Sequence, residues 1–164
     1  MLYNLEQTEA FAAQQNPVAK LLDVIEIIQK EHYTRTINRF PKFNGCKGVR
    51  AEKYAENKNP TPSAVDLAFA VSNNRNAKIV LSEMKFDCAS EKQAEKLASD
   101  IVDKVKGTKD LFSQDIPFFN KVYVLVDDGQ QRLLSRLQRE LTGKKSPDYK
   151  VCILKDLYDD FFAN

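Results

Sequence analysis

Cysteine and histidine are scarce in this sequence, and their scarcity excludes several common kinds of site. The 164 residues include three cysteines and one histidine, with no CxxC pair. A structural zinc site takes about four such ligands, and a serine or cysteine triad needs a histidine beside its nucleophile. His32 falls on the apolar side of an expected helix, which favours a packing role. An odd number of widely spaced cysteines fits reduced thiols, so we expect a cytoplasmic protein.

Long apolar runs and phosphate-binding glycine loops are also missing. No run reaches the roughly 18 apolar residues of a membrane span, and Glu6 and Glu9 stand where a signal peptide would be basic. We therefore expect no membrane association. Without a GxxxxGK[ST] loop, the acidic pair Asp127-Asp128 is expected to cap a helix rather than to serve a nucleotide site.

Composition and length indicate one compact domain over residues 1–164. Hydrophobic residues make up 43% and charged residues 29% of the chain, as in ordinary soluble globular proteins. No internal repeat, low-complexity segment or linker divides the chain. At this length the chain can bury a sound core but has little room for a second, target-recognising domain.

Two apolar, strand-like runs each contain one buried-looking acid. Residues 64–71 include Asp66, and residues 78–86 include Glu83. Both runs are rich in the β-branched and aromatic residues that favour strands, and the turn-forming segment between them predicts a hairpin. Charges inside such runs are costly unless they have a partner.

The expected register of this hairpin brings the two acids together. A turn centred between residues 74 and 75 pairs residues whose numbers sum to 149, so Asp66 faces Glu83. Their Cβ atoms would be roughly 5 Å apart, and like charges at that distance are destabilising unless a cation lies between them. Side chains alternate along a strand, so Lys85 shares this face while Met84 and Phe86 point the other way.

In these residues the chain resembles the PD-(D/E)xK nuclease superfamily, which has the restriction endonuclease-like fold. Asp66 matches the first acid of the family motif, and Glu83-Met84-Lys85 matches its ExK triplet. Pro62 lies near the motif proline but is not adjacent to the aspartate. The resemblance covers roughly residues 17 to 155. It implies an αβββαβ core and Mg²⁺-dependent hydrolysis of phosphodiester bonds that leaves a 5′-phosphate, with Mn²⁺ as a substitute ion.

The order of expected elements agrees with that core, an α/β domain with a mixed central sheet flanked by helices. Hydrophobic periodicity and capping residues predict these elements. In chain order they are a helix from about 17 to at least 33, a strand at 48–54, the hairpin, a helix from Ser90 to near Gly107, a strand at 121–126, a helix ending at Gly143, a strand at 149–154 and a helix at 156–162.

The resemblance also implies a role for each charged residue. Asp66 and Glu83 would be oxygen ligands for Mg²⁺, together with the Met84 backbone carbonyl, water and a substrate oxygen. Lys85 would orient or help to deprotonate the attacking water and offset charge on the phosphorane. The alternative is a structural ion cluster in which Lys85 neutralises both acids.

Two further polar residues are candidates for the site. Many members of the superfamily add an acid from the first helix, and Glu26 is slightly preferred over Glu31 because it lies beside the apolar stripe. Gln93 occupies a position where relatives place a polar active-site residue. Each has a simpler reading, since a helix glutamate often pairs with a lysine four residues away and a glutamine often lies on the surface.

Basic residues concentrate between positions 34 and 58. Seven lysines and arginines oppose two glutamates there, a balance of 7 − 2 = +5. Lys47, Arg50 and Lys53 from this segment, with Arg75 at the hairpin tip, are the predicted phosphate contacts. A solvated loop and edge strand with protective lysines is the alternative.

These observations predict a Mg²⁺-dependent nuclease that acts on DNA. The main alternative is a protein that keeps the nuclease fold as an inactive binding or assembly module in a DNA-processing or mobile-element system. A third class is a small-molecule or protein-binding domain. A homodimer fits the nuclease reading, because enzymes that cut both strands commonly work as pairs.

Overall fold

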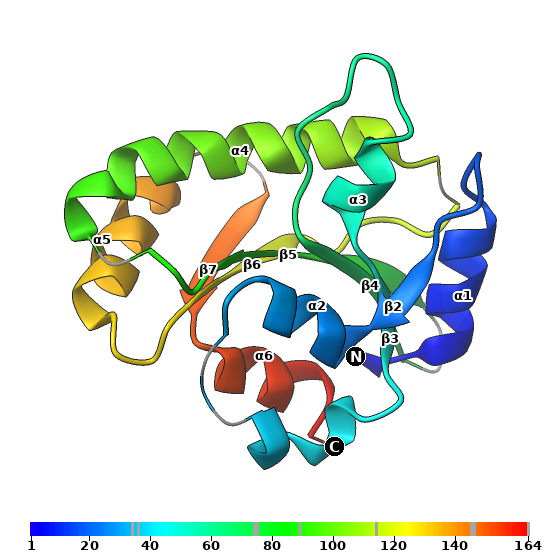
Figure 1. Ribbon diagram of the computed structural model, residues 1–164, viewed down its shortest axis with the longest axis horizontal. Coiled ribbons are helices and arrows are strands. Elements are labelled where there is room, and N and C mark those ends of the chain that lie inside the picture. Colours follow the sequence, from blue (N-terminus) through cyan, green and yellow to red (C-terminus); the bar gives the residue numbers. More distant parts are fainter. Residues whose placement is uncertain are drawn as a thin grey trace.

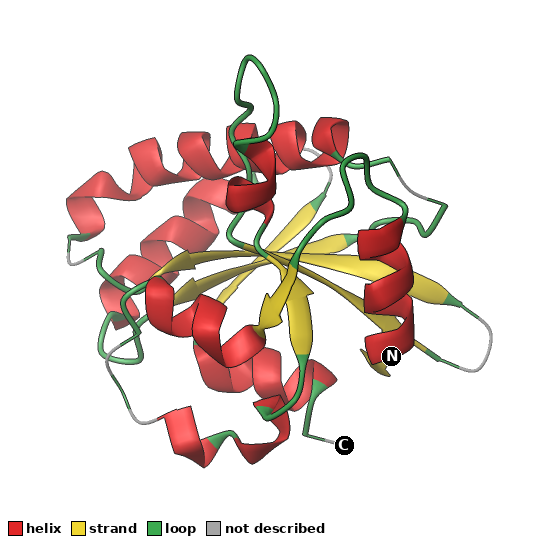
Figure 2. Ribbon diagram, turned by 45° about the vertical axis from the view of Figure 1, so that its right-hand side comes forward, coloured by secondary structure: helices red, strands yellow, loops and turns green. Residues whose placement is uncertain are grey.

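The chain folds as an α/β domain. The computed structural model describes residues 1–33, 35, 37–73, 76–88, 90–113, 115–144 and 147–163. A mixed sheet lies between two layers of helices (Figure 1 and Figure 2). The predicted fold class, a mixed central sheet flanked by helices, is therefore confirmed.

Seven strands form the sheet in the described part of the chain. Their order is β2-β3-β4-β5-β6-β7, and β1 pairs with β4. Neighbours from β2 to β5 are antiparallel, whereas β5, β6 and β7 are parallel. The strands are β1 (Leu2–Tyr3), β2 (Leu21–Asp23), β3 (Lys47–Val49), β4 (Leu67–Ser72), β5 (Ala77–Lys85), β6 (Lys121–Val126) and β7 (Asp148–Cys152).

Helices cover both faces of the sheet. α1, α3, α4 and α5 pack on one face, and α2 and α6 pack on the other (Figure 1). The α-helices are α1 (Leu5–Ala13), α2 (Val24–Lys30), α3 (Ala51–Ala55), α4 (Ala94–Leu111), α5 (Gln131–Thr142) and α6 (Leu154–Phe161). Short 3-10 turns are η1 (Ile37–Arg39), η2 (Pro41–Phe43) and η3 (Glu91–Gln93). Within the ranges given above, no helix is both long and apolar enough to cross a bilayer.

The β4–β5 hairpin has the predicted register. Leu67 lies opposite Ser82, and the paired residue numbers sum to 149 along the whole hairpin. Leu81 packs in the core beneath α4, and Met84 packs in the core on the α2 and α6 side. The alternation of side chains along β5 is therefore confirmed, and it follows from the pleat of the strand.

The predicted helix at 17–33 is wrong over its first part. The Asn16-Pro17 peptide is cis, residues 18–20 are coil, and β2 pairs with β3 before α2 begins at Val24. Leu21 and Leu22 pack against opposite core clusters, as neighbours in a strand do. Two adjacent leucines fit both the helical and the strand periodicity, so pairing with β3 decides the conformation of this segment.

Two other predictions at the N-terminal half need correction. The strand predicted at 48–54 ends at Val49, and the chain continues as α3. Helix α1 was not predicted, although Asn4 caps it by accepting a hydrogen bond from the Gln7 N–H. Both helices are short, so their sequence periodicity is weak.

Asp127 and Asp128 do not cap the helix that follows them. Helix α5 begins at Gln131, and Asp127 instead binds the Arg35 guanidinium through both carboxylate oxygens. Asp128 pairs with Arg39 at 2.8 Å. The strand-end acids thus hold the segment after α2 against the end of β6.

Gly107 lies inside α4 and does not end it. A Cβ atom at this position would lie 2.1 Å from the carbonyl oxygen of Ser63, so only glycine lets the helix approach this backbone. We predict that Gly107→Ala destabilises the protein by about 1–3 kcal/mol, because the steric cost exceeds the roughly 1 kcal/mol gain in helix propensity. Urea unfolding measures the change.

Gly143→Ala is the matched control for this substitution. Gly143 lies at the end of α5 with an ordinary φ of −75°, and a Cβ there meets no atom within 4 Å. Its unfolding free energy should change by less than about 1 kcal/mol. Equal stability of the two variants would show that α4 does not press against Ser63.

Candidate functional site

Two buried carboxylates face each other at one end of the β4–β5 hairpin. Asp66 directly precedes β4 and is 2% exposed, and Glu83 in β5 is 0% exposed. Oδ2 of Asp66 accepts a hydrogen bond of 2.6 Å from the Met84 backbone N–H. The hairpin register therefore places both acids on the sheet face that α4 covers.

Two lysines approach this pair from different elements. Lys85 Nζ lies 2.6 Å from Oε1 of Glu83, and Lys104 Nζ from α4 lies 2.7 Å from the same oxygen. Lys104 Nζ is also 3.8 Å from Oδ1 of Asp66, which is too long for a hydrogen bond. One ammonium group is therefore shared between both acids.

The two carboxylate oxygens of Glu83 have different surroundings. Oε2 is buried and makes no hydrogen bond within the described residues. A buried carboxylate oxygen without a donor costs free energy, and such groups in native structures commonly point to a missing water or ion. Oε2 is thus the oxygen of Glu83 that could hold a cation.

Charge and burial shift the pKa values of Asp66 and Lys85. Burial and then the neighbouring Glu83 raise the pKa of Asp66, Lys104 and the Met84 N–H oppose the shift, and the net pKa is about 8. Burial lowers the pKa of Lys85, but the Glu83 carboxylate outweighs it and the net shift is upward. The raised pKa favours a proton on Asp66 in the metal-free protein.

A hydrogen-bonded threonine fixes the segment that carries Asp66. The buried Thr108 hydroxyl accepts a bond of 2.9 Å from the Val65 N–H and donates one of 2.7 Å to the Lys104 carbonyl. Val65 immediately precedes Asp66, so one side chain of α4 ties the acid to the turn that carries Lys104.

Lys104 was not predicted as part of the site. It lies three residues after Ile101 and four before Thr108, and both of these are buried on the inner stripe of α4. A lysine at that helical spacing is the signal that could have identified it.

The helix acids lie differently from the prediction. The preferred candidate, Glu26, has a side chain 45% exposed and pairs with Lys30, four residues along α2. Glu31 at the end of α2 is more buried, binds Arg50 at 2.8 Å, and its charge contributes to the raised pKa of Asp66. Of the two, Glu31 is the acid that interacts with the site.

Gln93 lies exposed in η3. Its backbone N–H donates to the Ser90 carbonyl, and this bond belongs to the turn that opens α4. The structure shows no contact between the Gln93 side chain and either acid within the described residues.

Three of the four predicted phosphate contacts form ion pairs with acids. Lys47 pairs with Asp23, and Lys53 pairs with Glu56. Arg50 binds both Glu31 and Glu52. Arg75 lies outside the described residues. The positive charge of the 34–58 segment is therefore largely balanced, partly by acids within the segment and partly by acids elsewhere in the chain.

The donor set determines which ion could fit. The described ranges contain no group of three or more His, Cys, Asp or Glu side chains arranged to hold a metal. Mg²⁺ needs no such group, because it usually keeps several waters and is bound by one or two carboxylates with substrate oxygens. Asp66 and Glu83 supply two carboxylates, and Glu83 Oε2 is unpartnered, so the residues present fit this ion. Zinc or calcium would require a larger protein shell.

Comparison with known proteins adds no assignment. Neither family models, nor curated proteins, nor solved structures gave a match to this chain.

Proposed function

We propose that this protein is a Mg²⁺-dependent nuclease that hydrolyses phosphodiester bonds of DNA on a restriction endonuclease-like core. The observation that supports the proposal most is the buried Asp66–Glu83 pair beside Lys85, in which Glu83 Oε2 has no hydrogen-bond partner among the described residues. An oxygen-liganded cation beside an ammonium group is an arrangement suited to phosphoryl chemistry.

Each side chain has a distinct role in this proposal. Asp66 and Glu83 would hold Mg²⁺, which lowers the pKa of bound water and polarises the phosphate when it is present. The Met84 carbonyl is a further oxygen that could serve the ion. Lys85, held by Glu83 at 2.6 Å, would orient the attacking water and offset negative charge on the phosphorane.

One observation favours a second candidate, an inactive module that keeps the same fold for binding or assembly. Lys85 and Lys104 together place two positive charges beside the two acids, so the cluster needs no metal to offset the charge of its carboxylates. The uneven distribution of these contacts favours the nuclease. Both lysines bind Oε1 of Glu83, while no lysine of the described residues lies within hydrogen-bond distance of Asp66.

The test is cleavage of supercoiled plasmid and of short labelled DNA by the purified protein. We expect nicking or cutting with Mg²⁺ or Mn²⁺ and none with EDTA. Lys85→Ala, purified in the same way, identifies any contaminating nuclease, because a contaminant would cut equally in both preparations. Absence of metal-dependent cleavage on duplex, single-stranded and branched DNA would favour the inactive module.

A further inference from the structure

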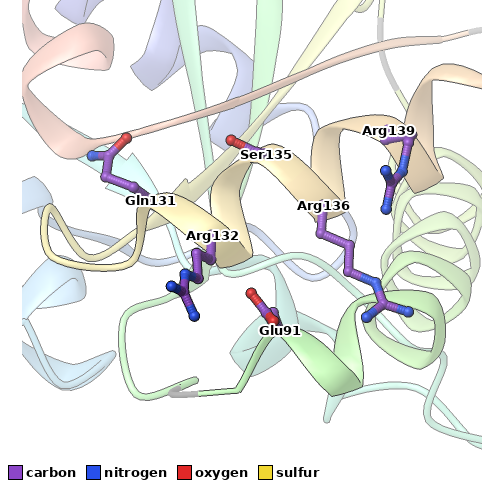
Figure 3. A pocket seen from close by; sticks show the side chains of 6 residues that line it. All are labelled: Glu91, Gln131, Arg132, Ser135, Arg136 and Arg139. Atoms are coloured by element: carbon purple, nitrogen blue, oxygen red, sulfur yellow. The ribbon is translucent and has the colours of Figure 1, made fainter.

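Helix α5 presents three arginines on one face. Arg132, Arg136 and Arg139 follow one another at spacings of four and three residues, which places them on the same side of a helix. With Glu91, Gln131 and Ser135 they line a hollow of about 480 Å³ between α5 and η3. Figure 3 shows the Arg132 and Arg136 side chains extending from α5 toward the segment that carries Glu91.

These arginines differ from most of the other arginines in having no close acidic partner. Arg132 and Arg139 are exposed and form no ion pair within the described residues. Arg136 Nε lies 4.0 Å from Oε1 of Glu140, beyond hydrogen-bond distance, and is buried without a hydrogen bond. By contrast, Arg35, Arg39 and Arg50 bind carboxylates at 2.8 Å. Among the described residues, the arginines without an acid within hydrogen-bond distance are thus gathered on α5.

The three arginines of α5 follow in the chain from the same strand ends that carry the candidate site, the ends of β5 and β6. β5 and β6 are parallel, and Lys85 pairs with Val126 where both strands end. Glu91 follows β5 by six residues and Gln131 follows β6 by five, so the walls of the hollow continue from these two strand ends. Helix α5 also packs on the face of the sheet that carries the acids.

The spacing of the arginines suits a nucleic-acid strand. Seven residues of helix from Arg132 to Arg139 span about 10 Å at 1.5 Å per residue. A strand of B-DNA presents one phosphate per 3.4 Å of axis, or about three over that length. Guanidinium groups bind phosphate oxygens with two parallel hydrogen bonds, which makes arginine well suited to such contacts.

We propose that the α5 arginine face, defined by Arg132, Arg136 and Arg139, binds the phosphate backbone of the DNA strand that enters the candidate site. This inference rests on the proposed function, since it takes DNA as the substrate. It moves the main phosphate contacts from the acid-paired residues of segment 34–58 to arginines of α5 that have no acid within hydrogen-bond distance in the described part of the chain. Glu91 opposes the bound phosphates across the hollow and lowers affinity.

The experiment measures binding without chemistry. Fluorescence anisotropy of a labelled DNA duplex is recorded in EDTA at several salt concentrations for the wild type and for Arg132→Gln/Arg139→Gln. The control, Lys30→Gln/Lys155→Gln, removes the same charge from lysines paired with acids on other helices. Glutamine keeps helix propensity close to that of arginine and lysine, and circular dichroism verifies folding.

The expected result separates the two double variants. Arg132→Gln/Arg139→Gln should weaken binding at least about tenfold at low salt and lower the slope of log K against log salt by about 2. In the control, the loss of affinity and the change in salt slope should each be no more than about a third of those in the arginine variant. Glu91→Gln should tighten binding. Equal losses in both double variants, or no DNA binding by the wild type, would overturn the inference.

Failure of this inference differs from failure of the proposed function. If the protein cleaves DNA with metal but its DNA affinity does not depend on Arg132 and Arg139, the phosphate-binding role of the α5 arginines is refuted and the nuclease proposal stands. Arginine-dependent binding without any cleavage would support the face and count against the nuclease.

Discussion

Lys85→Ala is expected to lower metal-dependent DNA cleavage by about 10²- to 10³-fold while the protein stays folded. The size of the loss is that of removing one charged donor from a developing negative charge. Folding should survive because Lys104 still binds Glu83 at 2.7 Å after the substitution. Single-turnover cleavage rates and urea unfolding of the same preparations measure the two effects.

Lys104→Ala is the matched variant for this prediction. It removes an ammonium group at nearly the same distance from the same carboxylate oxygen, but from helix α4 rather than from the ExK triplet. Because Lys104 lies between the acids, a bound cation would take over its charge, and cleavage at saturating Mg²⁺ should fall by less than about tenfold. Equal loss in both variants would indicate an ion cluster with a purely structural role.

Asp66 is expected to make the metal-free protein less stable as the pH rises. Its pKa is raised from 3.8 to about 8 in the folded chain, chiefly by burial and then by Glu83. The folded state therefore binds a proton more tightly than the unfolded state does. The resulting stabilisation is complete below about pH 4 and is lost as the pH rises through about 8, a change on the order of several kcal/mol.

Asp66→Asn should remove this slope, because the amide keeps the shape of the neutral acid and can still accept from the Met84 N–H. At pH 9 the variant should be more stable than the wild type, and near pH 4 the two should be similar. Asp103→Asn, an exposed position on the same helix as Lys104, is the control and should keep the wild-type slope. Parallel stability curves for the wild type and Asp66→Asn would show that Asp66 titrates normally.

The sequence predicts the part of the fold that depends on local pattern. The hairpin register follows from two alternating apolar runs around one turn, and the continuous run at 121–126 gives the bounds of β6. The inner stripe of α4 was predicted as well. In each case many residues repeat one spacing, so tertiary contacts cannot easily override it.

The remaining differences arise from contacts between distant residues. Leu21 and Leu22 become a strand only because β3 is available to pair with them. The bond between Arg35 and Asp127 joins residues 92 positions apart, and no pattern along the chain indicates it. The same holds for the candidate site. Asp66 and Glu83 meet through a local hairpin and could be predicted, whereas Lys104 reaches them from a helix placed by packing.

Calorimetric titration of the metal-free protein with Mg²⁺ near pH 7, repeated with Mn²⁺, shows whether Asp66 and Glu83 bind a metal ion. We expect one ion per chain, with about one proton released from Asp66 as it binds, seen as a dependence of the heat on the buffer. Asp66→Asn should show neither the binding nor the proton release. Identical heats from the wild type and Asp66→Asn, or no binding by the wild type at millimolar metal, would contradict this expectation.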